Sequence, residues 1–100
     1  MNIDREPALL SMLKAMWGMV TPNLRGIYIG QKDGAKCLYF YYENIPSEDE
    51  EELASLMHTE FIADFPLQNI DFEIHTLPST KKIPKDGWCV YLRYGELGPV

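Results

Sequence analysis

The sequence has few cysteines and no long apolar segment. Cys37 and Cys89 are the only cysteines, and each lies in an apolar run typical of a strand, so we expect two buried free thiols and no disulfide. The start of the chain does not resemble a basic signal peptide, and no apolar run approaches the length of a membrane span. These absences favour a cytoplasmic protein that does not enter a membrane.

Basic residues are missing from the middle of the chain. The net charge of −6 divides into +2 for residues 1–36, −10 for residues 37–80 and +2 for residues 81–100. A surface made from the middle segment should repel nucleic acids and anionic membranes, because phosphate binding needs clustered Lys or Arg. Such a surface suits a basic protein partner. The alternative is that the carboxylates only keep a small domain soluble.

The chain also lacks the common catalytic and cofactor motifs. It has no phosphate-binding glycine loop, no Cys-x-x-Cys pair and no Gly-x-Ser-x-Gly sequence. On the helix expected around residue 60, Glu60 and Asp64 share a face, but His58 points elsewhere, so the metal site they could form is weak. We therefore expect no enzyme activity, no cofactor and no metal. A small enzyme using His58 or His75 with one of these carboxylates is the alternative.

An acidic helix is the best-marked element that the sequence does contain. Ser47 is placed to accept a backbone N–H as the N-cap, and Glu50 can complete a capping box. Five consecutive carboxylates fill residues 48–52, where the positive end of the helix dipole favours negative charge. Pro66 prevents the helix from continuing. The pattern predicts a helix over residues 48–64.

The remaining elements follow from periodicity and turn residues. Apolar residues from position 8 to position 20 predict a first helix that packs into the core, with exposure of Trp17 as an interface anchor left as the alternative. Strands are predicted over residues 25–30, 36–43, 70–75 and 88–94, with Asp33 and Gly34 as a hairpin turn. Residues 78–87 have the composition of a loop and residues 95–100 that of a loose tail.

This order predicts one α+β domain over residues 1–100, with the sequence helix-strand-strand-helix-strand-strand. We expect a four-stranded, mainly antiparallel sheet with two helices packed on one face. Hairpins are expected to make each consecutive strand pair antiparallel. The second strand is apolar on both faces, which is typical of a central position. In the last strand, one predicted face holds Trp88, Val90, Leu92 and Tyr94, and the other holds Cys89, Tyr91 and Arg93.

The acidic helix has an apolar stripe that should face the sheet. Met57 and Phe61 lie four residues apart in this stripe, and Glu60 flanks it. Glu60 can pair with Arg25 or Arg93 of the sheet, which would be a structural role. It can equally pair with a basic residue of a partner, and the sequence leaves both possibilities open.

Four segments of the sequence are distinctive. They are Thr21-Pro22-Asn23-Leu24-Arg25, Leu38-Tyr39-Phe40-Tyr41-Tyr42, Thr59-Glu60-Phe61-Ile62-Ala63-Asp64-Phe65-Pro66 and Val90-Tyr91-Leu92-Arg93. Together they resemble small bacterial immunity proteins, the partners of polymorphic toxins that include those of contact-dependent growth inhibition. The resemblance implies a non-enzymatic, cytoplasmic inhibitor that binds one cognate toxin domain, commonly a nuclease.

The acidic pattern and this resemblance together predict a partner and a surface. We expect a heterodimer with the C-terminal domain of a toxin, a basic RNA-cleaving nuclease whose active-site surface is covered by an acidic face. The residues predicted to contact the toxin are Glu48, Asp49, Glu51, Glu52, Glu60, Asp71, Glu73, Tyr39 and Tyr41. Lys81, Lys82 and Lys85 must then lie on the far side or meet an acidic part of the toxin. An acidic adaptor for another basic protein is the alternative function.

Overall fold

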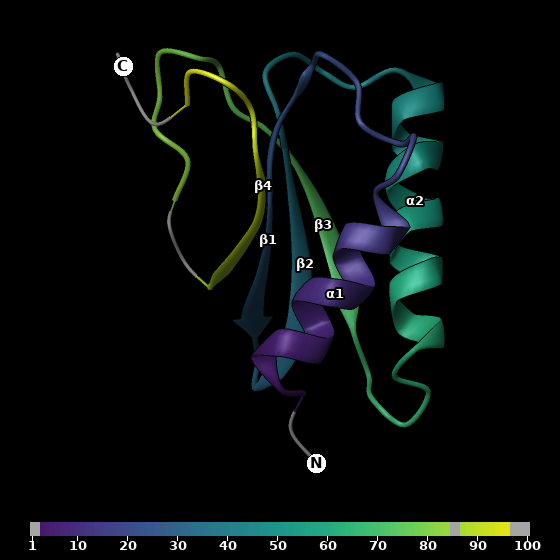
Figure 1. The fold of residues 1–100 in the computed structure, drawn as a ribbon. Helices are drawn as coiled ribbons and strands as arrows, with labels where there is room; N and C mark the ends of the chain where they lie inside the picture. Colours follow the sequence, from purple (N-terminus) through teal and green to yellow (C-terminus); the bar gives the residue numbers. More distant parts are fainter. Residues whose placement is uncertain (1–2, 85–86, 97–100) are drawn as a thin grey trace.

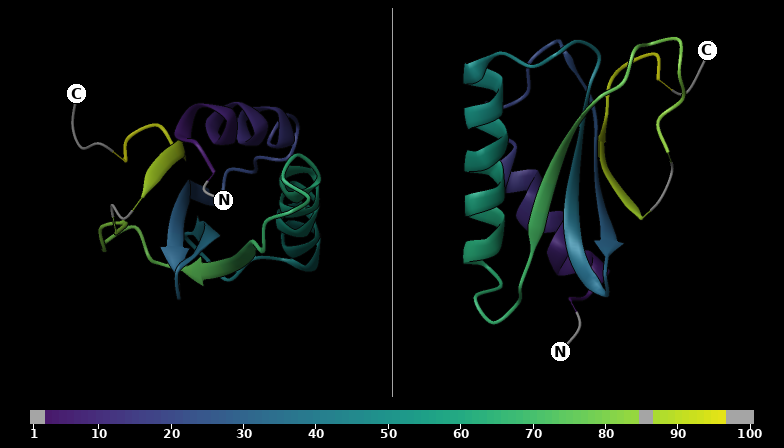
Figure 2. Two further views of the ribbon diagram at one scale, coloured as in Figure 1. Left: turned by 90° about the horizontal axis from the view of Figure 1, so that it is seen from below. Right: turned by 180° about the vertical axis from the view of Figure 1, so that it is seen from behind.

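The computed structural model describes residues 3–84 and 87–96 and shows two helices packed on one face of a four-stranded sheet (Figures 1 and 2). The elements are α1 (Arg5–Ala15), β1 (Leu24–Lys32), β2 (Ala35–Tyr42), α2 (Glu48–Ala63), β3 (Asp71–Thr76) and β4 (Trp88–Leu92). The element order and the α+β class are as predicted. The strand order across the sheet is β3-β2-β1-β4, so β2 is central, as its apolar composition indicated.

The hairpin between β1 and β2 forms at the expected turn. Asp33 and Gly34 both have positive φ, of 53° and 82°, which are the angles that a two-residue type I′ turn requires. Lys32 and Ala35 pair directly across this turn, and the antiparallel pairing extends to Leu24 and Tyr42 with one register shift between Leu24 and Gly26. This hairpin makes the centre of the sheet.

The pairing of the last two strands differs from the prediction. We expected β3 and β4 to form an antiparallel hairpin, but β3 pairs in parallel with β2, and β4 pairs antiparallel with β1 at the opposite edge. The physical reason is that α2 serves as the crossover that a parallel connection needs. The chain after β3 then reaches the far edge beside β4 (Figure 1). The sheet is mainly antiparallel, with one parallel pair.

The first helix is shorter than predicted. It ends at Ala15 and not near residue 20, and the chain turns through Gly18, whose φ is +73°. A glycine with positive φ just beyond a helix is a common terminator, because only glycine adopts that conformation at little cost. The wrong boundary came from following the apolar residues past this glycine.

The core lies between the helices and the sheet. Met12 of α1 and Met57 and Phe61 of α2 are fully buried against side chains from β1 and β2. The fully buried strand residues of this cluster include Leu24, Ile27, Leu38 and Phe40. Burying a large apolar side chain stabilises a protein by about 1.5–3 kcal/mol, so these contacts hold the helix layer onto the sheet.

Part of the first helix was wrongly assigned to the core. Leu10, Leu13 and Trp17 were expected to pack inside, but their side chains are 63%, 42% and 74% exposed. The helix buries its other face, which carries Ala8, Ser11, Met12 and Ala15. Of the two possibilities left open for Trp17, the structure shows the exposed one.

The second face of the sheet is partly covered by the segment after β3. Ile83 is buried there against Tyr28 and Tyr41. Gly87 has a φ of +101°, and a Cβ atom at this position would lie 2.2 Å from the carbonyl oxygen of Ile29. The chain therefore approaches β1 so closely that only glycine fits at position 87.

Two other local expectations are corrected. The register between β1 and β4 shifts, so that Ile27 pairs with Tyr91 while Tyr28 pairs with Cys89. This irregularity leaves Val90 without a partner and breaks the strict alternation: Tyr91 packs with the helix-side core and Leu92 with the other face. Cys37 is buried and free as expected, whereas Cys89 is free but exposed.

A buried arginine fastens the end of the described chain to the sheet. Arg25 is 2% exposed, and its guanidinium donates to both carboxylate oxygens of Glu96 at 2.9 and 2.7 Å. It also donates to the carbonyl oxygens of Leu77 and Pro78. Residues 95–100 were expected to form a loose tail. Glu96 is anchored instead, and residues 97–100 lie outside the described part.

Candidate functional site

The acidic helix begins as the sequence predicts. The Ser47 hydroxyl accepts the Glu50 N–H at 3.1 Å, and a Glu50 carboxylate oxygen accepts the Ser47 N–H at 3.1 Å, which completes the capping box. Glu50 also accepts hydrogen bonds from Thr21 and Asn23. Desolvation raises the pKa of Glu50, but these hydrogen bonds outweigh it and leave the pKa below its ordinary value. Glu50 therefore has a structural role.

The other carboxylates at this helix start differ from Glu50, because they have no partner in the part of the chain that the structure describes. Glu48, Asp49, Glu51 and Glu52 are exposed, and their side chains make no hydrogen bond or ion pair with any described residue. They occupy the first two turns of α2, at the top of that helix in Figure 1. The helix dipole favours them there, while their crowding makes them repel one another. The result is a compact patch of uncompensated negative charge, which we call the α2 acidic patch.

The two carboxylates at the other end of α2 differ from each other. Asp64 accepts a hydrogen bond from the Ser11 hydroxyl at 2.6 Å and so connects the two helices. Glu60 is exposed and has no partner in residues 3–84 and 87–96. Of the two roles left open for Glu60, the structure does not show the pairing with Arg25 or Arg93. Arg25 binds Glu96, and Arg93 binds Glu96 and Glu43.

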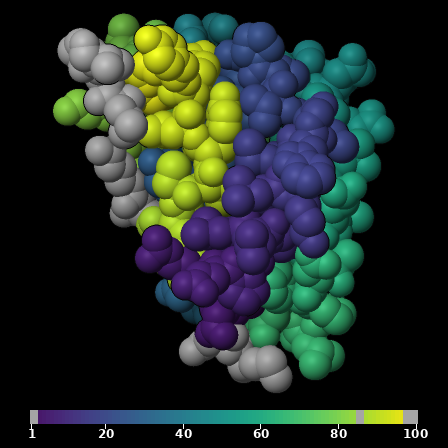
Figure 3. Space-filling view, in the orientation of Figure 1, coloured from purple at the N-terminus to yellow at the C-terminus, as the bar shows by residue number. Residues whose placement is uncertain are grey.

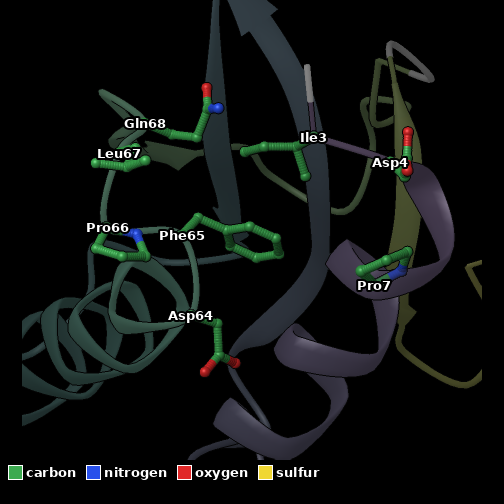
Figure 4. A pocket seen from close by; sticks show the side chains of 8 residues that line it. All are labelled: Ile3, Asp4, Pro7, Asp64, Phe65, Pro66, Leu67 and Gln68. Atoms are coloured by element: carbon green, nitrogen blue, oxygen red, sulfur yellow. The ribbon is translucent and has the colours of Figure 1, made fainter. Parts of the chain in front are cut away.

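Hollows lie on both sides of Asp64. One, of about 340 Å³, runs between the helices and includes Lys14 and Glu60 in its lining. The other, of about 280 Å³, lies between the start of α1 and the end of α2, and Figure 4 shows Phe65 and Ile3 pointing into it. The full lining of the second hollow is Ile3, Asp4, Pro7, Asp64, Phe65, Pro66, Leu67 and Gln68. Ser11, in the lining of the first hollow, donates its hydroxyl hydrogen to Asp64 in the bond that connects the two helices, and neither lining includes a histidine or a cysteine among the described residues.

The remaining predicted contact residues lie on the other face of the sheet. The parallel register of β2 and β3 sets Tyr39 beside Glu73 and Tyr41 beside His75. The His75 ring stacks on Tyr41 with a centroid distance of 5.5 Å and lies 6.0 Å from that of Tyr39. Tyr41 is only 8% exposed and Tyr39 is half-buried. These rings form a partly covered aromatic surface.

Glu73 on this face is already paired within the chain. Its carboxylate accepts hydrogen bonds from Lys32 and from the His75 ring. The hydrogen bond from Lys32, followed by that from His75, lowers the pKa of Glu73. Asp71, two residues earlier on β3, is exposed and has no partner among the described residues. Of the two predicted acidic contacts here, only Asp71 is free to meet a partner's charge without breaking an internal pair.

The predicted contact residues thus fall in three places. Glu48, Asp49, Glu51 and Glu52 come together at the start of α2. Glu60 lies about two turns beyond them on the same helix. Tyr39, Tyr41, Asp71 and Glu73 lie on the sheet face opposite the helices, so the structure does not unite the set in one site.

The lysines of the segment after β3 lie away from the α2 acidic patch. Lys81 and Lys82 are exposed on the segment that Ile83 anchors to the second sheet face. This segment lies on the same sheet face as Tyr39 and Tyr41, so these lysines are on the far side from the α2 acidic patch but not from the predicted contact residues of the sheet. Lys85 lies outside the described residues.

The histidines have structural surroundings. His58 Nε2 lies 2.7 Å from the Ile70 carbonyl oxygen, and its ring packs on Phe72 with a centroid distance of 4.6 Å. His75 is held by Glu73 and Tyr41, as described above. Within the described ranges, no group of three or more His, Cys, Asp or Glu side chains is placed to hold a metal ion.

The most prominent surface feature that the sequence analysis missed is the exposed apolar face of α1. The signal was present in the sequence, because Leu10, Leu13 and Trp17 follow a helical spacing distinct from that of Ala8 and Met12. Reading all apolar residues as one broad stripe concealed this second face. Among the described residues, no helix is both long and apolar enough to cross a membrane.

Comparison with known proteins identifies one family. The sequence model of the MafI2 immunity protein matches residues 5–95, which includes all six elements of the fold. No curated protein matches the chain.

Proposed function

This chain belongs to the MafI2 immunity protein family, and from that membership we propose that it neutralises one cognate toxin domain by covering that domain's basic surface with the α2 acidic patch. The toxin in this proposal is an RNA-cleaving nuclease. The mode of action is stoichiometric binding without catalysis, in a heterodimer with the C-terminal domain of the toxin.

The observation that carries the proposal is the contrast between paired and free carboxylates. Glu43, Glu50, Glu73 and Glu96 are each satisfied by a hydrogen-bond donor of the chain itself. The four carboxylates of the α2 acidic patch have no such donor among the described residues, although they stand close together. Free carboxylates need no internal bond to be broken before they bind a basic surface.

A nuclease is the partner that this charge fits best. An RNA-cleaving enzyme must bind phosphates, and it does so with clustered Lys and Arg. Carboxylates concentrated on two helical turns can occupy the positions that phosphates would take in such a cleft. Complementary charge also speeds association, up to about 10⁸–10⁹ M⁻¹s⁻¹ at low salt, which favours capture of a toxin before it acts.

The other predicted contact residues either extend the α2 acidic patch or form a competing surface. Glu60 extends the acidic surface along α2 and is free to pair with a basic residue of the toxin. Tyr39, Tyr41, Asp71 and Glu73 make a rival surface on the opposite side of the sheet. The two surfaces lie on opposite sides of the sheet, so one toxin molecule is expected to contact only one of them, and substitutions on the two surfaces should differ in their effect on binding.

The test is binding to the toxin domain encoded immediately upstream of this gene. The two proteins should co-purify, and the chain should protect cells that express the domain. Changing Glu48, Asp49, Glu51 and Glu52 to their amides should slow association by roughly 10- to 100-fold at low salt and flatten its salt dependence. The amides keep the size of the side chains, and circular dichroism would confirm that the variant is folded.

A matched pair of single variants separates the two surfaces. Glu51→Lys and Asp71→Lys change the net charge equally, and both residues are exposed without a partner in the described chain. Only Glu51→Lys should weaken the complex if α2 is the contact. A stronger effect of Asp71→Lys would move the interface to the sheet, and absence of any complex or protection would refute the toxin proposal and favour an acidic adaptor.

A further inference from the structure

The outer face of α1 is apolar and uncovered. Leu10 and Leu13 share this face at 63% and 42% exposure, while the opposite side of the helix packs into the core, and Trp17, in the turn just after the helix, is 74% exposed. No other described segment lies over it: α1 runs across the front of the molecule in Figure 1, and its side chains form the front surface in Figure 3. Exposed apolar side chains at adjacent positions on one helix face are typical of an interaction surface.

Opposite charges flank this apolar face symmetrically. Glu6 lies one turn before Leu10 and Lys14 one turn after it, both are exposed, and neither forms an ion pair within residues 3–84 and 87–96. The separation is four residues in each direction, so both charges lie on the same side of the helix as Leu10. The face is therefore negative at one end, apolar in the middle and positive at the other end.

We propose that this face binds the same face of a second copy of the chain, with the two α1 helices antiparallel and crossing at Leu10. In this arrangement Leu10 packs on Leu10 of the second copy. Glu6 of each copy lies opposite Lys14 of the other, so a two-fold axis makes the charge pair twice. A parallel arrangement would bring like charges together instead. The complementarity is contained in the helix itself and requires no other partner.

Leu13 extends the contact beyond Leu10. Counting from the crossing at Leu10, Leu13 lies at the level of Pro7 of the second copy. Pro7 is exposed in the single chain. The two-fold axis makes this contact twice, which increases the apolar area buried.

The contact is small, because it uses one helix from each copy. Stable dimers bury about 1,200–2,000 Å² in total, and a single helix pair lies at or below the lower end of this range. The association is therefore weak and depends on protein concentration in the micromolar range. It does not use the α2 acidic patch, so it is independent of the proposed toxin contact.

Sedimentation equilibrium of the full chain over a wide concentration range tests this proposal. The wild-type chain should show a reversible monomer–dimer equilibrium. Leu10→Lys should abolish the dimer without unfolding the chain, because Leu10 is largely exposed. Ile45→Lys is the matched control, since Ile45 is 84% exposed and lies in the connection between β2 and α2, outside the proposed contact, and it should leave the equilibrium unchanged.

Charge exchange tests the antiparallel geometry. Glu6→Lys and Lys14→Glu should each weaken the dimer about tenfold, because each single change replaces two attractive pairs with two repulsive ones. The double variant with both changes should recover the wild-type dissociation constant to within about threefold. A wild-type chain that is monomeric at every concentration, or a double variant that fails to recover, would overturn the proposal. Monomeric wild type combined with loss of toxin binding in Leu10→Lys would assign this face to the toxin instead.

Discussion

Glu96→Gln should destabilise the protein far more than a similar change on the surface. Glu96 accepts two hydrogen bonds from Arg25, whose side chain is only 3% exposed, and one from Arg93 at 2.9 Å. The substitution keeps the shape of the side chain and removes its charge. It leaves the Arg25 guanidinium buried without its counter-ion.

The magnitude follows from the burial of the pair. Breaking a buried ion pair by removing one partner costs about 3–5 kcal/mol. Here the amide oxygen can still accept one hydrogen bond, and Arg25 retains the carbonyl oxygens of Leu77 and Pro78. We therefore expect a loss of about 2–3 kcal/mol in the free energy of unfolding, or roughly 10–20 °C in thermal midpoint for a domain of this size.

The same pair predicts a definite pH dependence. The hydrogen bond from Arg25 holds the pKa of Glu96 below its ordinary value of 4.5. A group whose folded-state pKa is lowered stabilises the protein above its unfolded-state pKa, and this stabilisation is lost as the pH falls through the folded-state pKa. The difference between wild type and Glu96→Gln should therefore be constant above about pH 5 and shrink below 4.5, since glutamine does not titrate.

Urea unfolding followed by circular dichroism measures both effects. Glu43→Gln is the matched control: Glu43 binds Arg93 at 2.8 Å, but the two side chains are 33% and 25% exposed, so the loss should be under about 1 kcal/mol. Equal losses for the two variants at neutral pH would refute the role given to burial. A difference between wild type and Glu96→Gln that persists unchanged at pH 3 would refute the assignment of the lowered pKa to this pair.

Two further predictions concern the packing of the fold. Gly87→Ala should lower the free energy of unfolding, measured with urea, by at least about 2 kcal/mol, because its Cβ would lie 2.2 Å from the Ile29 carbonyl oxygen at a φ of +101°. Gly34→Ala is the control: its φ is +82° but the space around it is open, so the loss should be about 1 kcal/mol. Equal losses for the two variants would contradict the close approach of residue 87 to β1. Phe61→Ala should lower the free energy of unfolding by about 3–5 kcal/mol, because the ring is fully buried between α2 and the sheet. The control Leu56→Ala, at a residue that is 43% exposed, should lower it by less than about 1 kcal/mol. Comparable losses for the two variants would place Phe61 outside the core.

The division of the carboxylates into two groups shapes the functional interpretation. The structural group forms hydrogen bonds that hold the ends of the sheet and the start of α2, as Glu50 and Glu96 do. The group without a partner in the described chain includes Glu60 and Asp71, and four of its members gather at the first turns of α2. Net charge alone does not distinguish these groups, although only the second is available to a basic partner without a loss of stability.

Features that depend on neighbouring residues were predictable from the sequence. Ser47 and Glu50 marked the start of α2, and Pro66 placed its end within one residue of the observed one. Asp33 and Gly34 identified the hairpin, because a two-residue turn with positive φ accepts few other residues. Within the candidate site, the exposure of the four carboxylates of the α2 acidic patch also agrees with the sequence, since charges at a helix start are rarely buried.

Features that depend on distant contacts were not predictable. The sequence identifies β3 as a strand with one polar, solvent-facing side, but the residues near β3 in the sequence do not determine whether it pairs with β2 or with β4. Glu60 was a reasonable partner for Arg25 by composition, yet the actual partner is Glu96, 71 residues along the chain. The apolar residues of α1 do not reveal which face the sheet will cover until the helix is docked.

The sequence by itself determined the order of the elements, their approximate limits and the concentration of negative charge at the start of α2. Each of these depends on interactions within one or two turns of chain, which act before the fold is complete. Only the tertiary structure decided the strand order, the burial of Arg25 with Glu96, and the bare face of α1. These features depend on contacts between distant parts of the chain. Those contacts form when α2 connects β2 to β3 and the chain then passes to the far edge of the sheet, so they are set by the packing of the whole domain.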